Sequence, residues 1–223
     1  MEKKMEKNQS EKIHIICEVA IMGALGFVFD TLGSSIFRGI FSAGGGISLA
    51  MLPILIIAFR RGTLAGVSTG LIVSLLGMST GLYVLPGESY KIVLQVLLDY
   101  VLTYPLVGLA GLFRKPFRNS SKKMGYLFLI LGALLGGTLK FLSQFTGGCI
   151  FWADPSISPF VWKELESAPY VYVFLYNIAY TGPSMILCMG FLTLIYNRVP
   201  FILNKDLKKV NNDEEIEEIK EDK

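Results

Sequence analysis

Three polar side chains in apolar surroundings, Asp99, Lys140 and Asn177, have the types and spacing that suggest chemistry. Each lies within a long apolar segment, where a charged group costs about 3 kcal/mol and therefore usually faces a partner or a cavity. At the rise of an α-helix, all three lie ~12–13 Å from the ends of their segments on one side of the membrane. An acid, a base and an amide at one level predict a polar site between helices.

The neighbours of these residues favour a binding pocket. In the segment 139–152 (LKFLSQFTGGCIFW), helical spacing places Lys140 and Gln144 on one stripe of polar and small residues. Aromatic surface comes from Tyr100, Trp152 and Tyr172. Polar groups and aromatic rings suit a small ligand with a flat ring, and a carboxylate beside aromatic faces suits a cation. The alternative is that Asp99 and Lys140 only pair to hold two helices together, which does not explain the amide and the rings.

The elements that must position these residues are membrane helices. The 223 residues are 52% hydrophobic, and the charges gather at the ends and in short connectors, which predicts an all-α, polytopic membrane protein. A glycine-rich loop at 33–46 is expected to fold back toward the membrane, and the last helix is expected to kink at Pro183. The six transmembrane helices are expected at about 13–32, 47–59, 63–80, 90–113, 124–148 and 169–196.

Basic residues predict the orientation. The N-terminal tail, Arg60-Arg61, the connector 114–123 and the C-terminal tail hold 4, 2, 5 and 6 lysines and arginines. With six helices, all of these lie on one side, so both termini are predicted to be cytoplasmic. The expected organisation is a cytoplasmic tail at 1–12, a six-helix domain at 13–198 and a charged cytoplasmic tail at 199–223.

The sequence argues against an enzyme. It offers no nucleophile beside a base, no paired carboxylates and no set of metal ligands, so neither a cofactor nor a metal is expected. Its three cysteines lie in separate apolar segments without metal-ligand spacing. The chain lacks GxxxxGK[ST], and therefore uphill transport would need energy from a partner or an ion.

Several stretches carry a family resemblance between residues 15 and 200. In order, these are AIMGA, LAMLPILIIAFRRG, LLDYVLTYPLVGLAGLFRK, LKFLSQFTGGCIFW and YVYVFLYNIAYTGPSM. The chain resembles the thiamine-specific substrate-binding (S) components of energy-coupling factor (ECF) vitamin transporters, the ThiT family. The resemblance implies a prokaryotic cell-membrane subunit that captures thiamine with high affinity from outside. Such subunits deliver the vitamin with a transmembrane scaffold subunit and two ABC ATPases.

The resemblance also implies roles for individual residues. Asp99 stands where the family typically has a glutamate that holds the aminopyrimidine, and Trp152 matches the tryptophan that stacks on the ligand. Two positions depart from the family pattern: Gln144 replaces a usual histidine, and Gly44-Gly45-Gly46 occupies a loop where some members have another tryptophan. The implied ligand-binding residues are Asp99, Tyr100, Lys140, Gln144, Trp152, Tyr172 and Asn177.

Ala20 and Ala24 match the family's AxxxA motif, which docks on the scaffold subunit. Small residues one turn apart permit close approach of another helix. From the residues alone, packing within the chain together with Gly23 and Gly26 explains the pattern equally well. Two alternatives for function also stay open: an S component for a related heterocyclic vitamin or precursor, and a structural membrane protein that transports nothing.

Overall fold

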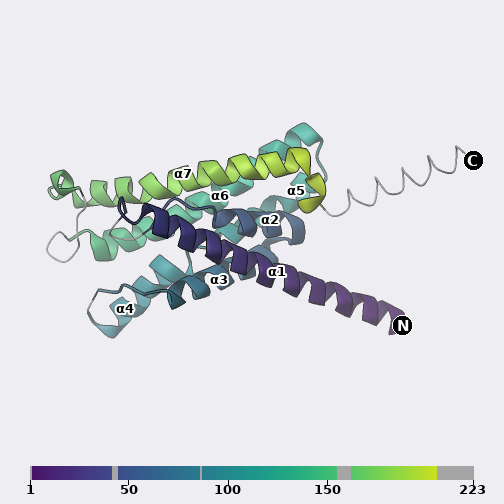
Figure 1. Cartoon of the computed structure of the whole chain (residues 1–223), viewed down its shortest axis with the longest axis horizontal. Coiled ribbons are helices and arrows are strands. Elements are labelled where there is room, and N and C mark those ends of the chain that lie inside the picture. The colour runs from purple at the N-terminus through teal and green to yellow at the C-terminus, as the bar shows by residue number, and fades with distance from the viewer. Residues whose placement is uncertain (1, 42–44, 86, 155–161, 205–223) are drawn as a thin grey trace, which may run out of the picture.

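The computed structural model describes residues 2–41, 45–85, 87–154 and 162–204, and these are helices joined by short connections, without a β-strand among them. The all-α prediction is therefore confirmed (Figure 1). The α-helices are α1 (Glu2–Phe37), α2 (Met51–Arg61), α3 (Thr63–Ser79), α4 (Ser89–Val96), α5 (Arg114–Arg118), α6 (Lys122–Gly147) and α7 (Pro169–Arg198).

Three segments of the described chain are long and apolar enough to cross a membrane: Gln9–Phe37, Lys122–Trp152 and Pro169–Arg198. A bent pair, Ser89–Val101 and Pro105–Arg118, would make a fourth crossing, and α3 is a shorter apolar helix. Each of the six predicted helical segments thus has a helical counterpart in the structure. Six complete crossings remain a prediction.

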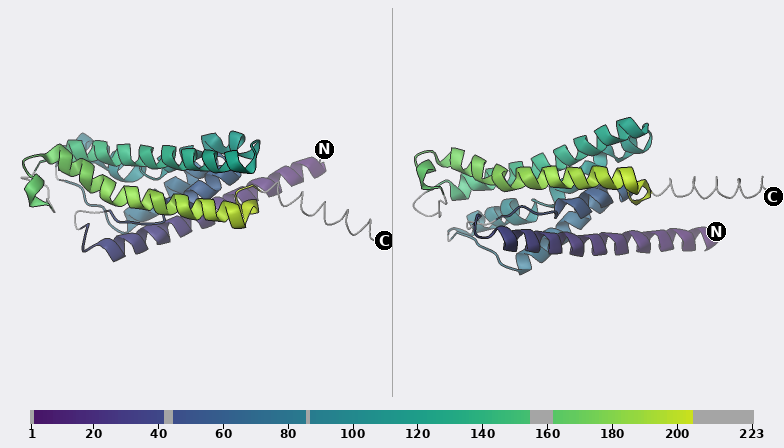
Figure 2. Two further views of the ribbon diagram at one scale, coloured as in Figure 1. Left: turned by 90° about the horizontal axis from the view of Figure 1, so that it is seen from above. Right: turned by 45° about the horizontal axis from the view of Figure 1, so that its top comes forward.

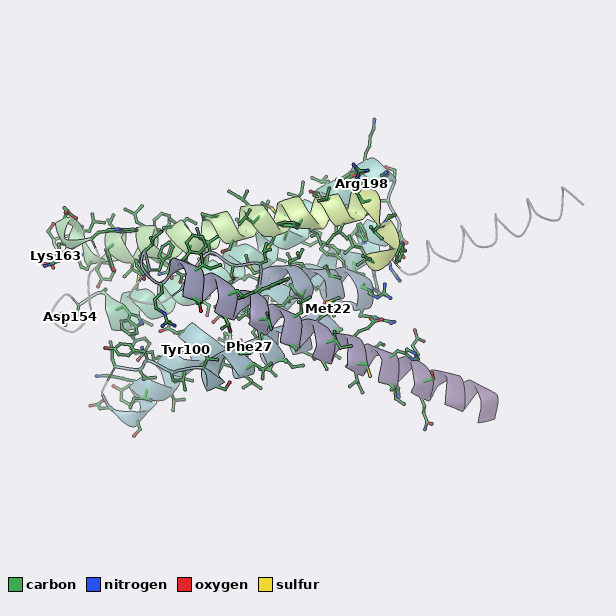
Figure 3. All side chains as sticks on the ribbon, viewed as in Figure 1. Met22, Phe27, Tyr100, Asp154, Lys163 and Arg198 are labelled. Carbon is green, nitrogen blue, oxygen red and sulfur yellow. The ribbon has the colours of Figure 1, made fainter. Side chains whose placement is uncertain are left out.

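The two ends of the described chain lie at the same end of the molecule, as expected for an even number of crossings (Figure 1). Arg198, at the end of α7, lies at this end, whereas Asp154 and Lys163 lie at the opposite end (Figure 3). Both views in Figure 2 show α6 and α7 side by side, with α1 on another side of the molecule. The cytoplasmic location of the termini remains a prediction.

The short helix α2 forms the centre of the fold. All of its residues from Met51 to Phe59 are buried, and they pack against α1, α3, α7 and the 3₁₀ segment η2 (Pro105–Phe113). Pro53 is tolerated because it lies in the first turn, where its missing N–H has no helical partner. Gly62 joins α2 to α3 with a φ of 104°, a conformation that favours glycine.

Ion pairs between acids of α1 and the two arginines at the end of α2 hold these helices together. The carboxylate of Glu18 lies 2.6 Å from Nε of Arg61 and 3.2 Å from Nε of Arg60. Arg60 also donates to the backbone carbonyls of Phe201 and Ile202 beyond α7. The contacts fix the half of α1 that precedes Ala20 and Ala24.

The structure corrects several expected boundaries. Helix α1 begins at Glu2 rather than near Ile13. Helix α1 continues to Phe37, so the first part of the loop expected at 33–46 is helical. Gly33 explains how: a Cβ there would collide with Ser48, so glycine lets the returning chain lie directly on the helix.

A further correction concerns the helix expected at 90–113, which is broken. Helix α4 passes into the π-helical turn η1 (Leu97–Val101), and the chain then bends by 47° before η2. Pro105 starts η2 and lacks the N–H that would continue the preceding helix. Part of the connector expected at 114–123 is also helical, as α5.

Candidate functional site

Asp99 and Trp152 come together from two π-helical turns. Asp99 lies in η1, and Trp152 ends η3 (Gly148–Trp152), which continues α6. The indole Nε1 of Trp152 donates a hydrogen bond to Oδ2 of Asp99 at 2.9 Å. A π-helical turn carries an extra residue and is frequent at functional sites, because it changes the direction of the side chains that follow.

The first cavity lies beside this hydrogen bond. It has a volume of about 160 Å³, and its walls come from η1, α6, η3 and α7, with Gly45 from the segment before α2. Six of the seven predicted ligand-binding residues line it: Asp99, Tyr100, Gln144, Trp152, Tyr172 and Asn177. Asp99 and Asn177, which were expected at one level, thus line the same cavity.

Lys140 lines a second cavity of about 460 Å³ rather than the first. The two cavities share Asp99, Gln144 and Tyr180 in their walls, so they adjoin each other. Lys140 is only 6% exposed and donates to Oε1 of Gln144 at 2.9 Å. Its Nζ also lies 5.2 Å from the ring centroid of Tyr104.

The predicted alternative of a structural pair between Asp99 and Lys140 has no support in these contacts. Asp99 accepts from Trp152, whereas Lys140 donates to Gln144, and the two side chains form no ion pair with each other in the described part of the chain. Each therefore contributes its charge to a cavity wall.

Sequence reasoning missed two tyrosines of α7. Tyr176 and Tyr180 line the first cavity together with Tyr172, and all three are buried. The hydroxyl of Tyr180 donates to Oδ1 of Asn177 at 2.5 Å, which orients the amide. The signal was present in the sequence, because residues spaced by four lie on one face of a helix.

Asp30 of α1 was also missed. It lines the second cavity and accepts a hydrogen bond from the hydroxyl of Tyr104. Like Asp99 and Lys140, it is a charged residue inside an apolar stretch, here the one expected at 13–32, so it met the criterion by which those two were selected. Its partner is 74 residues away and could not be read from the sequence.

Tyr83, in the connection between α3 and α4, covers one face of Trp152. The two rings stack with centroids 5.5 Å apart and an interplanar angle of 25°. The hydroxyl of Tyr100 donates to the backbone oxygen of Tyr83 at 3.0 Å and accepts from its N–H at 3.0 Å. This aromatic contact closes one side of the site, and no spacing rule links Tyr83 to Trp152.

The small residues of α1 divide into two sets. Gly23 and Gly26 are buried, and a Cβ at either would collide with Ile72 or Val73 of α3. Ala20 and Ala24 are exposed. The packing that explains the glycines therefore does not extend to the alanines.

The glycine-rich loop before α2 was expected to depart from the family pattern at Gly44-Gly45-Gly46. Gly45 and Gly46 line the cavities, and Gly44 lies outside the described residues.

The arrangement as a whole suits binding rather than bond chemistry. Carboxylate, amide and ammonium groups alternate with aromatic rings around two adjoining cavities, which is the lining expected for a small aromatic ligand with polar edges. Tyr100 lies in the half of the molecule away from Arg198 and the N-terminal end (Figure 3). Fold and site together define an all-helical membrane protein of the ligand-binding class.

Comparisons with known proteins agree with this class. The family model described as thiamine transporter protein matches residues 16–204, so the chain belongs to that family. It is 30% identical over 205 residues to the thiamine transporter ThiT of Bacillus subtilis, covering 89% of this chain and 98% of the relative. It is 28% identical over 152 residues to the thiamine transporter ThiT of Lacticaseibacillus paracasei, covering 65% and 71% of the two chains.

A solved structure shares the fold. The structure of ThiT from Listeria monocytogenes superposes with a TM-score of 0.67 at 22% identity, covering 86% of this chain and 98% of that one. The resemblance stated from the sequence motifs is therefore confirmed at the level of the family. These relatives are transporters by name, so the family is one of transport proteins rather than enzymes.

Proposed function

We propose that this chain is the thiamine-binding S component of an ECF-type importer in a bacterial cell membrane. The observation that carries the proposal is the first cavity, where the carboxylate of Asp99, the indole of Trp152 and the amide of Asn177 converge. An aminopyrimidine offers an amino group and ring nitrogens, and these need an acceptor and donors at its edge. Membership in the thiamine transporter family selects this ligand among flat heterocycles.

In this proposal Asp99 accepts a hydrogen bond from the ligand's amino group. The bond from Trp152 holds the carboxylate in one orientation, and a carboxylate can accept several hydrogen bonds at once. Trp152 offers ring surface beside the same edge, and Asn177 adds an amide held by Tyr180. Capture is from the outside, because Tyr100, which lines both cavities, lies in the half of the molecule away from Arg198 and the N-terminal end (Figure 3). Those ends are the ones expected on the cytoplasmic side.

Delivery of the bound thiamine into the cell requires partner proteins. The chain has no phosphate-binding loop of the GxxxxGK[ST] type, so ATP-driven import depends on separate ATPases. Ala20 and Ala24 supply an exposed small-residue surface on α1 where a helix of a transmembrane scaffold subunit can approach closely. We assign this surface to the scaffold.

Identification of a co-purified ligand tests the proposal. The protein is purified in detergent from cells supplied with thiamine, the bound small molecules are released and identified by mass spectrometry, and Asp99→Asn is purified in parallel. We expect thiamine with the unaltered chain and much less with the variant. Release of a different heterocycle would point to a related vitamin or precursor, and empty protein that also fails to bind added thiamine would favour a structural role.

A further inference from the structure

The carboxylate of Glu18, on α1, binds both arginines at the end of α2. Arg61 donates from Nε and Nη2 at 2.6 and 2.7 Å, and Arg60 donates from its own Nε and Nη2 at 3.2 and 3.3 Å. The side chain of Arg61 is only 8% exposed, so this contact lies against the protein and not in open water. A guanidinium that meets a carboxylate with two bonds fixes direction as well as distance. The contact therefore fixes how α1 is rotated about its own axis at Glu18.

Glu18 and the two alanines of the AxxxA motif point to opposite sides of α1. An α-helix turns by about 100° per residue, so Ala20 lies about 200° and Ala24 about 240° around the helix from Glu18. The burial agrees, because Val19 next to Glu18 is buried, whereas Ala20 and Ala24 are exposed. A contact that holds Glu18 toward the protein thus also directs the alanines away from it.

Apolar packing does little to fix this part of α1. Among residues 9–22, Val19 alone is buried, and it belongs to a small apolar cluster with Ile57 of α2. The close contacts of Gly23 and Gly26 with α3 come later in the helix. Apolar packing is non-directional, so it holds two helices near each other without setting their rotation. The rotation before Gly23 therefore depends on the ion pairs.

We propose that Glu18 is a positioning residue for docking: held by the two arginines, it sets the rotation of α1 that presents Ala20 and Ala24 to a partner helix. The inference rests on the proposed function, in which these alanines meet the transmembrane scaffold subunit. Close approach of two helices requires small residues at the contact. A rotated α1 would place the larger, exposed side chains of Ile21 and Leu25 there instead.

The ligand site does not depend on this rotation. No residue of α1 is among the described residues that line the first cavity. The second cavity takes Asp30 and Ser34 from α1, and both follow the glycines that pack on α3. Loss of the Glu18 contact should therefore affect docking and spare thiamine binding.

Scaffold retained per thiamine-binding chain tests the proposal. The full chain is co-expressed with the scaffold subunit and the ATPases and purified by its own tag, and the retained scaffold and the thiamine affinity are both measured. Glu18→Gln removes the charge at nearly the same side-chain length. It should lower the association with the scaffold about tenfold, which corresponds to 1.4 kcal/mol, while the thiamine affinity stays unchanged.

Glu11→Gln is the matched control. It removes an acid from the same helix, and that acid lies 3.8 Å from Nη1 of the same Arg61 but is 53% exposed. Exposed pairs of this kind contribute little, so scaffold association should not change. Arg61→Lys keeps the positive charge without the two-bond contact, and it should lower the association about threefold. It decides the question if Glu18→Gln does not fold.

The two readouts separate positioning from a general structural role. A contact that only stabilises the bundle would, when lost, reduce thiamine binding and scaffold association together, and that result would overturn the inference. Unchanged association in Glu18→Gln and Arg61→Lys would overturn it as well. An unaltered chain that binds no thiamine, or that binds thiamine and retains no scaffold, would instead contradict the proposed function.

Discussion

Trp152 holds Asp99: the indole Nε1 and the carboxylate Oδ2 are 2.9 Å apart, and each residue belongs to a π-helical turn. The contact joins η1, in the broken helix between α4 and η2, to η3, which continues α6. It orients the acid toward a cavity without neutralising its charge, because indole is a neutral donor.

Replacing Asp99 by asparagine separates charge from structure. Asparagine keeps a side-chain oxygen that can accept from Trp152, so the melting temperature without ligand should barely fall. The charged hydrogen bond to the ligand contributes about 1.5–3 kcal/mol, so thiamine should bind about ten- to a hundredfold more weakly. Calorimetry and thermal unfolding measure the two effects. A large drop in melting temperature with unchanged affinity would show that Asp99 only holds helices together.

Trp152 should contribute through both its ring and its N–H. Trp152→Ala removes the stacking with Tyr83 and the hydrogen bond to Asp99, and we expect affinity to fall about tenfold or more. Trp152→Phe keeps an aromatic ring and should lose less. Ligand-induced fluorescence quenching should largely disappear in both variants, which leave Trp162 as the only indole. Trp162 packs against Tyr172 and Tyr176 of the same cavity, so undiminished quenching in Trp152→Ala would show that the ligand does not stack on Trp152.

The exposed alanines of α1 should matter for transport and not for binding. Ala20→Trp and Ala24→Trp should abolish thiamine uptake in cells, because a bulky ring prevents close approach of a partner helix. Affinity of the purified chains should stay near normal. Ile186→Trp, at a 65% exposed apolar position on α7, is the control and should retain both activities. Loss of binding in both alanine variants would place that surface inside the protein's own core.

The predicted orientation can be checked by labelling. In a chain whose cysteines 17, 149 and 188 are replaced by alanine, single cysteines are introduced at Asn119 and Glu164. A membrane-impermeant maleimide should label Glu164→Cys in intact cells and Asn119→Cys only after the membrane is opened. Labelling of both from outside contradicts the six-helix arrangement.

Hydropathy and helical rise predicted most of this architecture. The apolar segments became helices near their expected bounds, and six of seven ligand-binding candidates line one cavity because the rise per residue fixes the depth of a side chain. Lys140 lines the adjoining second cavity instead. Its position on the same stripe as Gln144 was correct, yet the direction of a long side chain depends on its neighbours.

Other features of the structure could not be predicted from any pattern in the sequence. A π-helical turn adds one residue without changing composition, so η1 and η3 could not be distinguished from ordinary helix. The stacking of Tyr83 on Trp152 joins residues far apart in the chain, and single-sequence periodicity carries no such information. Asp30 was recognisable as an acid at membrane depth, but only the fold places it beside Tyr104.

One calorimetric titration shows whether the first cavity of this protein binds thiamine. Thiamine is titrated into the detergent-solubilised, ligand-free chain, with the same protein carrying Asp99→Asn as the comparison. We expect saturable binding of one thiamine per chain, with the variant binding about ten- to a hundredfold more weakly. A folded chain that gives no saturable heat or fluorescence change with thiamine would contradict this expectation.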